Sequence, residues 1–182
     1  MFYPRYSKQL LIEALQDTPV VLLHGPRQSG KTTLAIEVGG KKYHYITFDD
    51  DTELAAAQYD PRGYIEGLPE YCILDEVQRA PELFPSIKMT VDRNRFPGKF
   101  LLTGSANILA IPRLSESLAG RMEIIHLRPL SQIEIEGNHC HFLNDAFSGD
   151  IKENYKERLG DKLFDRVISG GFPEPFQRSN AK

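Results

Sequence analysis

The residues with the clearest chemical potential in this sequence lie in the stretch "VVLLHGPRQSGKTTLA", from Val20 to Ala35. Eight of them, from Gly25 to Thr32, match the pattern G-x-x-x-x-G-K-[ST] at every required position. Such a loop binds phosphate because its glycines allow successive backbone N–H groups to point inward, and the helix that follows adds the positive end of its dipole. The residues predicted to contact the phosphates of a nucleotide are Gly25, Pro26, Arg27, Gln28, Ser29, Gly30, Lys31, Thr32 and Thr33.

Lys31 and Thr32 have separate predicted roles in this loop. Lys31 supplies a mobile positive charge for the β- and γ-phosphates, and Thr32 supplies a hydroxyl ligand for Mg²⁺. The alternative is a chance match, expected on the order of once per hundred chains of this length. The match also stands between a strand-like and a helix-like stretch, as a phosphate-binding loop requires, and this context favours the functional interpretation.

A pair of acids, Asp75 and Glu76, follows the mostly apolar residues Tyr71 to Leu74 in the stretch "YCILDEVQ". The apolar residues before them are typical of a buried strand, whose end would place Asp75 near the phosphates. A carboxylate there can hold Mg²⁺ through its water shell. Glu76 is then available to orient or deprotonate a water. The alternative is that Glu76 begins a helix and interacts with its dipole.

Small polar residues follow a further apolar stretch, "KFLLTGSAN". Thr103, Ser105 and Asn107 are candidates to contact the γ-phosphate or the attacking water. The alternative is that they are ordinary turn residues, because small polar side chains are common where a strand ends.

Strand-like and helix-like segments alternate along most of the chain, which predicts an α/β fold with a doubly wound, mostly parallel sheet and helices on both faces. In the helix-like segments, Ser7 is predicted to be an N-cap and Pro61 to end a helix. From Asn138 the alternation weakens and the remaining residues are predicted to be helical. The strand-like segments are 19–25, 43–50, 71–78, 99–107 and 122–130, and the helix-like ones are 7–17, 31–40, 51–61, 82–95, 113–120 and 131–137.

The composition is that of a globular protein, with 182 residues, 41% hydrophobic and 26% charged. A formal net charge of -3 excludes a global basic field for binding nucleic acid, although a local patch is compatible with it. The two cysteines, Cys72 and Cys140, have no metal-ligand spacing, and few cysteines favour a reducing, cytoplasmic location. No stretch approaches the roughly 20 apolar residues of a membrane span, so no membrane partner is expected.

Five stretches together resemble a prokaryotic branch of the AAA-type P-loop ATPases: "GPRQSGKTTL", "YCILDEVQ", "LLTGSAN", "LAGRM" and "LRPLSQIEI". The resemblance covers roughly residues 1–132 and touches "SGGFPEP" again. It implies ATP and Mg²⁺ as cofactors, and an ASCE-type sheet in which the strand "KFLLTGS" separates the P-loop strand from the acidic strand. It also implies that Lys31 and Thr32 contact nucleotide and Mg²⁺, that Asp75 holds Mg²⁺, and that Glu76 activates the water.

Two further roles come from the same resemblance. Ser105 best matches the polar sensor that follows the inserted strand, with Thr103 and Asn107 as the other candidates. Arg121, in "LAGRM", matches an arginine finger, and we expect it to act on the nucleotide of a neighbouring subunit, because the transferred phosphoryl group needs positive charge. The alternative is a surface arginine at the start of a strand.

The resemblance implies an ATPase domain over residues 1–137 and a helical extension over 138–182. Members of the family usually continue into a C-terminal domain of unresolved function. The chain reaches "SGGFPEPFQRSNAK" where that domain would begin. We therefore expect the extension to lead into a missing or truncated domain, the one that would define the partner.

The leading functional hypothesis is Mg²⁺-dependent ATP binding and hydrolysis that drives or gates a partner. The alternatives are a nucleotide-gated binding module with little turnover, a small-molecule kinase, and a protein that handles nucleic acid through "RPLSQ" or the basic residues from Lys88 to Arg95. Nothing after Asp75 resembles an acceptor pocket, which disfavours the kinase. The expected partners are a nucleotide, other copies of the chain, and an unidentified protein or nucleic acid.

Overall fold

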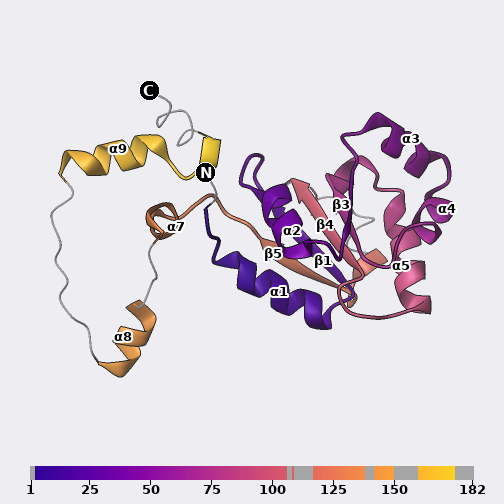
Figure 1. Cartoon of the computed structure of the whole chain (residues 1–182), viewed down its shortest axis with the longest axis horizontal. Coiled ribbons are helices and arrows are strands. Elements are labelled where there is room, and N and C mark those ends of the chain that lie inside the picture. The colour runs from indigo at the N-terminus through magenta and orange to yellow at the C-terminus, as the bar shows by residue number, and fades with distance from the viewer. Residues whose placement is uncertain (1–2, 106–107, 109–116, 138–141, 150–159, 175–182) are drawn as a thin grey trace. The chain divides into compact units, whose positions relative to one another are not determined.

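The computed structural model describes residues 3–105, 108, 117–137, 142–149 and 160–174 (Figure 1). The chain divides into two compact units. The larger unit is Tyr6–Arg128 and contains the sheet. The other combines Met1–Arg5 with Pro129–Lys182.

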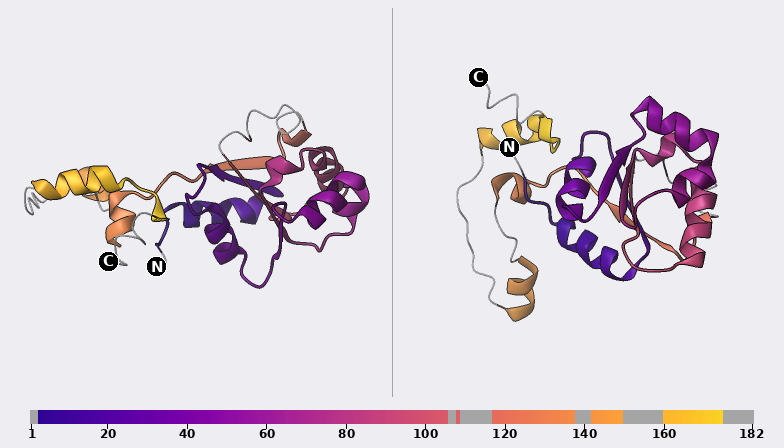
Figure 2. Two further views of the ribbon diagram at one scale, coloured as in Figure 1. Left: turned by 90° about the horizontal axis from the view of Figure 1, so that it is seen from above. Right: turned by 45° about the vertical axis from the view of Figure 1, so that its right-hand side comes forward.

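A five-stranded parallel sheet forms the centre of the larger unit, with the strand order β2-β3-β4-β1-β5. Because β4 lies between β3 and β1, the prediction that "KFLLTGS" is inserted between the acidic strand and the P-loop strand is confirmed. Since all strands run in the same direction, their carboxyl ends lie at one edge of the sheet (Figure 2). The strands are β1 (Val20–Gly25), β2 (His44–Thr47), β3 (Cys72–Asp75), β4 (Phe100–Ser105) and β5 (Met122–His126).

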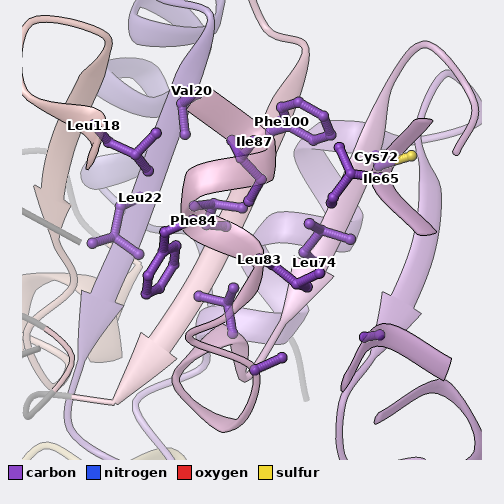
Figure 3. Close-up of a cluster of buried hydrophobic side chains, with 14 of the residues drawn as sticks. Val20, Leu22, Ile65, Cys72, Leu74, Leu83, Phe84, Ile87, Phe100 and Leu118 are labelled. Carbon is purple, nitrogen blue, oxygen red and sulfur yellow. The ribbon is translucent and has the colours of Figure 1, made fainter. Parts of the chain in front are cut away.

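Helices cover both faces of this sheet, as predicted. Successive strand residues point to opposite faces, so Leu22 belongs to one buried cluster, with residues of α3, α4 and α5, while Val21 belongs to another, with residues of α1 and α2. Figure 3 shows side chains of the first cluster, among them Leu22 of β1 and Phe84 and Ile87 of α5. The helices are α1 (Ser7–Asp17), α2 (Lys31–Gly39), α3 (Asp51–Tyr59), α4 (Pro61–Glu66) and α5 (Leu83–Arg93).

The structure corrects one predicted helix boundary and adds a helix that was not predicted. The residue that caps α1 is Tyr6, and Ser7 is already inside the helix. Helix α3 does end before Pro61, as predicted. However, Pro61 also starts the unpredicted α4, with the Asp60 side chain accepting a 2.9 Å hydrogen bond from the Gly63 N–H. Proline is favoured at the first helical position because its missing N–H has no partner there in any case.

The described part of the second unit contains helices, including Phe142–Ser148 and Asp161–Ser169 in the region where the sequence predicts helical structure. Ser131 and Glu134 form a capping box at the start of α7. Arg5 forms a buried ion pair with Glu134, with 3.2 Å between Nε and Oε1. None of the helices that the structure describes is both long and apolar enough to cross a membrane. The helices are α7 (Gln132–Glu136), α8 (Phe142–Ser148) and α9 (Asp161–Ser169).

Candidate functional site

The phosphate-binding loop joins the end of β1 to the start of α2, as the sequence predicts. Its two glycines are required for different reasons. Gly30 has φ 93°, in the left-handed region that side chains disfavour. A Cβ atom on Gly25 would overlap the carbonyl oxygen of Leu127, which follows β5. Gln28 is also left-handed, with φ 61°. The loop backbone therefore departs from regular structure between β1 and α2, as the predicted anion nest requires.

The Lys31 side chain is nearly buried inside this loop, where its Nζ donates a 2.9 Å hydrogen bond to the carbonyl of Pro26. The hydroxyl of Ser29 donates to the same carbonyl at 3.0 Å. Burial lowers the pKa of Lys31, while the nearby carboxylates of Glu76 and Asp75 oppose that shift. A positive charge and two negative charges therefore converge at this loop.

Asp75 ends β3 and is almost fully buried, yet hydroxyl groups surround its carboxylate. Thr32 donates to Oδ1 at 2.9 Å, and Thr103 donates to the same oxygen. Tyr45 donates to Oδ2 at 2.9 Å, and Thr47 lies 3.5 Å from that oxygen. These donors compensate for the burial of a charged group. The structure thus brings the two predicted metal ligands, Thr32 and Asp75, into direct contact.

Tyr45 and Thr47 were not among the predicted site residues. Both lie on β2, which pairs with β3 in a register that places Thr47 opposite Asp75. Burial, followed by the hydrogen bond to Asp75, raises the pKa of Tyr45 to about 12, so its hydroxyl remains a donor at neutral pH. Alternating positions in "YHYIT" indicate a shared face of the strand, but the register with β3 depends on tertiary packing.

Glu76 follows Asp75 in a left-handed backbone conformation, with φ 55° and ψ 41°. Its backbone N–H donates a 3.1 Å hydrogen bond to the Thr103 hydroxyl, and its carboxylate accepts from the side-chain amide of Gln78. The helix that follows, Val77–Arg79, is a single turn of 3₁₀ helix, and Glu76 makes no side-chain capping bond to it. Glu76 therefore does stand at the start of a helical turn, as the alternative predicts, but its carboxylate is bound to Gln78 and does not cap that turn.

The three sensor candidates have different surroundings. Thr103 is fully buried and bonded both to Asp75 and to the backbone of Glu76. Ser105 is the last residue of β4, and its N–H donates to the side-chain oxygen of Gln78 at 3.4 Å. Asn107 lies outside the described residues. Gln78, which sequence analysis did not select although it belongs to the quoted "YCILDEVQ", therefore connects Glu76 with the end of β4.

Arg121 is not brought to the phosphate-binding loop of its own chain. Its carbonyl accepts a 3.3 Å hydrogen bond from the N–H of Val20, the first residue of β1, whereas the loop begins at the other end of that strand. Its guanidinium pairs with Asp92 of α5, donating from Nε to Oδ1 and from Nη2 to Oδ2, the latter at 3.0 Å. This hydrogen bonding lowers the pKa of Asp92.

The residues at the loop fit a magnesium ion. Thr32 and Asp75 offer hard oxygen donors in contact with each other, which suits Mg²⁺. The described ranges contain no group of three or more histidine, cysteine or acidic side chains that could form a metal site. At nucleotide sites Mg²⁺ is generally bound through few protein ligands, together with phosphate oxygens and water.

Comparisons with known proteins show the family of this chain and a solved structure with a similar fold. The model of the AAA domain family matches residues 17–136. Two uncharacterized proteins, one from Mycobacterium bovis and one from Mycobacterium tuberculosis, are each 45% identical over 122 residues, which is 66% of this chain and 27% of the relative's own length. A Walker-type ATPase of Pyrococcus abyssi has a similar structure, with a TM-score of 0.57 and 17% identity over 94% of this chain and 65% of that one. At this identity the likeness shows the fold alone.

Proposed function

This chain belongs to the AAA domain family, and from that premise we propose that it binds ATP with Mg²⁺ and hydrolyses it, in a cycle that drives or gates a partner. One observation carries the proposal: the buried Asp75 carboxylate accepts a 2.9 Å hydrogen bond from the hydroxyl of Thr32, the residue that follows the P-loop lysine. An acid at the end of β3, which only β4 separates from β1, suits nucleotide chemistry better than a structural role, because burying a carboxylate is costly.

The chemistry follows from these positions. Thr32 and Asp75 would hold Mg²⁺, which would neutralise negative charge on the phosphate oxygens. Lys31 would exchange the Pro26 carbonyl for the β- and γ-phosphates, and the loop N–H groups would bind the same phosphates. Glu76, one residue beyond Asp75, would orient the attacking water and accept its proton. We assign hydrolysis to Asp75 and Glu76 because the second carboxylate is not needed for Mg²⁺ and can act on the water.

A second candidate is a nucleotide-gated switch with little turnover. It is favoured by the position of Arg121, which lies at the opposite end of β1 from the loop and pairs with Asp92. A single chain that lacks this arginine in its own site would hydrolyse ATP slowly, because phosphoryl transfer without an arginine finger loses a large part of its acceleration. Turnover that rises with protein concentration would distinguish assembly-dependent hydrolysis from a switch.

The test is phosphate release from ATP at several protein concentrations, with and without nucleic acid, combined with calorimetric titration of ATP and Mg²⁺. We expect Glu76→Gln to bind ATP but to hydrolyse it at least about 10²-fold more slowly, the scale of a lost general base.

Lys31→Ala should remain folded and lose most nucleotide affinity. Glu13→Gln, at an exposed glutamate of α1, is the matched control and should behave as wild type.

Near wild-type hydrolysis by Glu76→Gln would contradict the assigned base. Unchanged affinity of a folded Lys31→Ala variant would contradict the phosphate-binding loop. Stimulation of turnover by nucleic acid would favour the nucleic-acid alternative for the partner.

A further inference from the structure

The side chain of Gln78 lies between the predicted general base and the end of the neighbouring strand. Its Nε2 donates to Oε2 of Glu76, and its Oε1 accepts a 3.4 Å hydrogen bond from the N–H of Ser105. A Cβ atom on Gly104 would lie 3.1 Å from the same Oε1, so the Gln78 amide packs directly against β4. The Gln78 amide thus donates one hydrogen bond to Glu76 and accepts one from Ser105, so it links Glu76 to β4.

Glu76 is linked to β4 at two points, one directly through its backbone and one through Gln78. Its backbone N–H donates to the Thr103 hydroxyl at 3.1 Å, and its carboxylate is bound to Gln78, which in turn contacts Ser105. The left-handed backbone of Glu76 is unfavourable for a residue with a side chain and persists only where the surroundings hold it. The contacts to β4 are suited to hold both its backbone and its carboxylate.

We propose that Gln78 is a positioning residue that aims the Glu76 carboxylate at the attacking water. The inference rests on the proposed hydrolase function. By holding Oε2 of Glu76, the Gln78 amide fixes the direction of the other carboxylate oxygen, Oε1. This Oε1 accepts a proton from the attacking water. At the same time the water oxygen bonds to the γ-phosphorus, and the bond from that phosphorus to the leaving ADP oxygen breaks. A long glutamate side chain without this contact would sample several rotamers, and most of them would point away from the water.

An uncharged amide suits this task. It can donate to a carboxylate and accept from a backbone N–H at the same time, without adding charge beside Glu76 and Asp75. Gln78→Glu would keep the length of the side chain and the acceptor for Ser105 but replace the donor with a second carboxylate facing Glu76. Gln78→Ala would remove both contacts. The two variants therefore separate the contact to Glu76 from the contact to β4.

The kinetic test compares both variants with wild type and with Arg79→Ala, whose side chain in the same turn pairs with Asp49 and Asp51. We expect either Gln78 variant to lower kcat about 10- to 100-fold, the cost of a misplaced catalytic group, and to leave the KM for ATP within about 2-fold, since phosphate binding is not altered. Arg79→Ala should keep the wild-type kcat.

A double-mutant cycle shows whether Gln78 acts through Glu76. If it does, Gln78→Ala should cause no further loss in a Glu76→Gln background, because the group that it aims has already been removed. Full additivity of the two losses would overturn the proposal. A kcat equal to or higher than that of wild type in both Gln78 variants would also overturn the proposal.

Hydrogen exchange of the Ser105 amide tests the bridge without relying on activity. Gln78→Ala should speed this exchange by about 10-fold or more, because the amide loses its acceptor, whereas Gln78→Glu should keep it slow. Exchange unchanged in Gln78→Ala would overturn the bridge. If hydrolysis by wild type does not depend on Glu76, the proposed function fails, and the positioning role fails with it. If that dependence holds and Gln78 does not matter, only this inference fails.

Discussion

Asp75 is a nearly buried carboxylate to which side chains from three other elements converge. Hydroxyl groups of Thr32, Tyr45 and Thr103 donate to it, and they come from α2, β2 and β4. Such donors offset part of the cost of burial and also restrict how the carboxylate can rotate. Tyr45 and Thr103 therefore orient a predicted Mg²⁺ ligand without needing to touch the ion, as occurs around protein metal sites in general.

Tyr45→Phe tests this arrangement, because it removes one hydroxyl that donates to Oδ2 of Asp75 and keeps the aromatic ring. We expect the Mg²⁺ concentration for half-maximal ATP hydrolysis to rise about 10-fold, the lower end of the range for loss of a partner that orients a metal ligand. The matched control is Tyr59→Phe, since Tyr59 is 92% exposed at the end of α3. The same Mg²⁺ dependence in Tyr45→Phe and wild type would contradict the role.

At the level of secondary structure, the order and direction of the strands position the site residues and the phosphate-binding loop. Their parallel arrangement brings the ends of β1, β3 and β4 to one edge, and the insertion of β4 places Thr103 beside Asp75. The loop also depends on β5, because the residue that follows it, Leu127, donates a 2.8 Å hydrogen bond to the carbonyl of His24. The segment after β5 therefore lies against the start of the phosphate-binding loop.

Gly25→Ala should destabilise the larger unit through this contact. The new Cβ would overlap the Leu127 carbonyl oxygen, so the backbone would have to shift, at a cost of about 1–3 kcal/mol in the free energy of unfolding, as for other overpacked sites. Denaturant titration measures the effect. Gly40→Ala is the comparison, because its Cβ would meet open space and only its φ of +53° is unfavourable. A smaller loss in Gly25→Ala than in Gly40→Ala would contradict the close approach.

Much of this architecture could be predicted from the sequence because local patterns carry it. The apolar runs and the loop between them indicate a parallel sheet, and the resemblance to the family implied the position of β4. The short helix α4 was not predicted, because a proline is equally compatible with the end of one helix and with the first residue of the next.

The residues that tie the site together could not be predicted in the same way. Tyr45 contacts Asp75 only because of the register between β2 and β3, and Gln78 contacts Ser105 only because β4 is inserted beside β3. The pairing of Arg121 with Asp92 likewise joins residues 29 positions apart. Such contacts depend on tertiary packing, whereas motif spacing reports only which residue types are available.

In the larger unit, two groups of functional candidates lie at opposite ends of the sheet strands. The phosphate-binding loop and the acids lie where β1 and β3 end, while Arg121 and Asp92 lie where β1 begins. Six residues of strand separate the two ends, roughly 20 Å at about 3.3 Å per residue, which exceeds the reach of an arginine side chain. If Arg121 takes part in hydrolysis, it must do so in a neighbouring copy.

The prediction is therefore that Arg121 stabilises the phosphoryl group bound by the next subunit. Its guanidinium already holds a carboxylate through two nitrogens, the geometry that also suits phosphate oxygens. Exchanging Asp92 for the phosphates of a neighbour would link hydrolysis to assembly, and a contact of that head-to-tail kind closes into a ring or continues as an open array. If the pair is only a surface ion pair, neither residue should affect turnover.

Mixing two inactive variants distinguishes these cases. Arg121→Ala and Lys31→Ala should each lose most turnover, and their mixture should recover part of it, because some interfaces would pair an intact loop with an intact arginine. Asp92→Ala is the matched control: it removes the other half of the ion pair and should retain turnover. Absence of recovery, with assembly confirmed by sedimentation, would contradict action in trans. Equal loss in Asp92→Ala and Arg121→Ala would show that the ion pair itself is what matters, because a finger requires only the arginine.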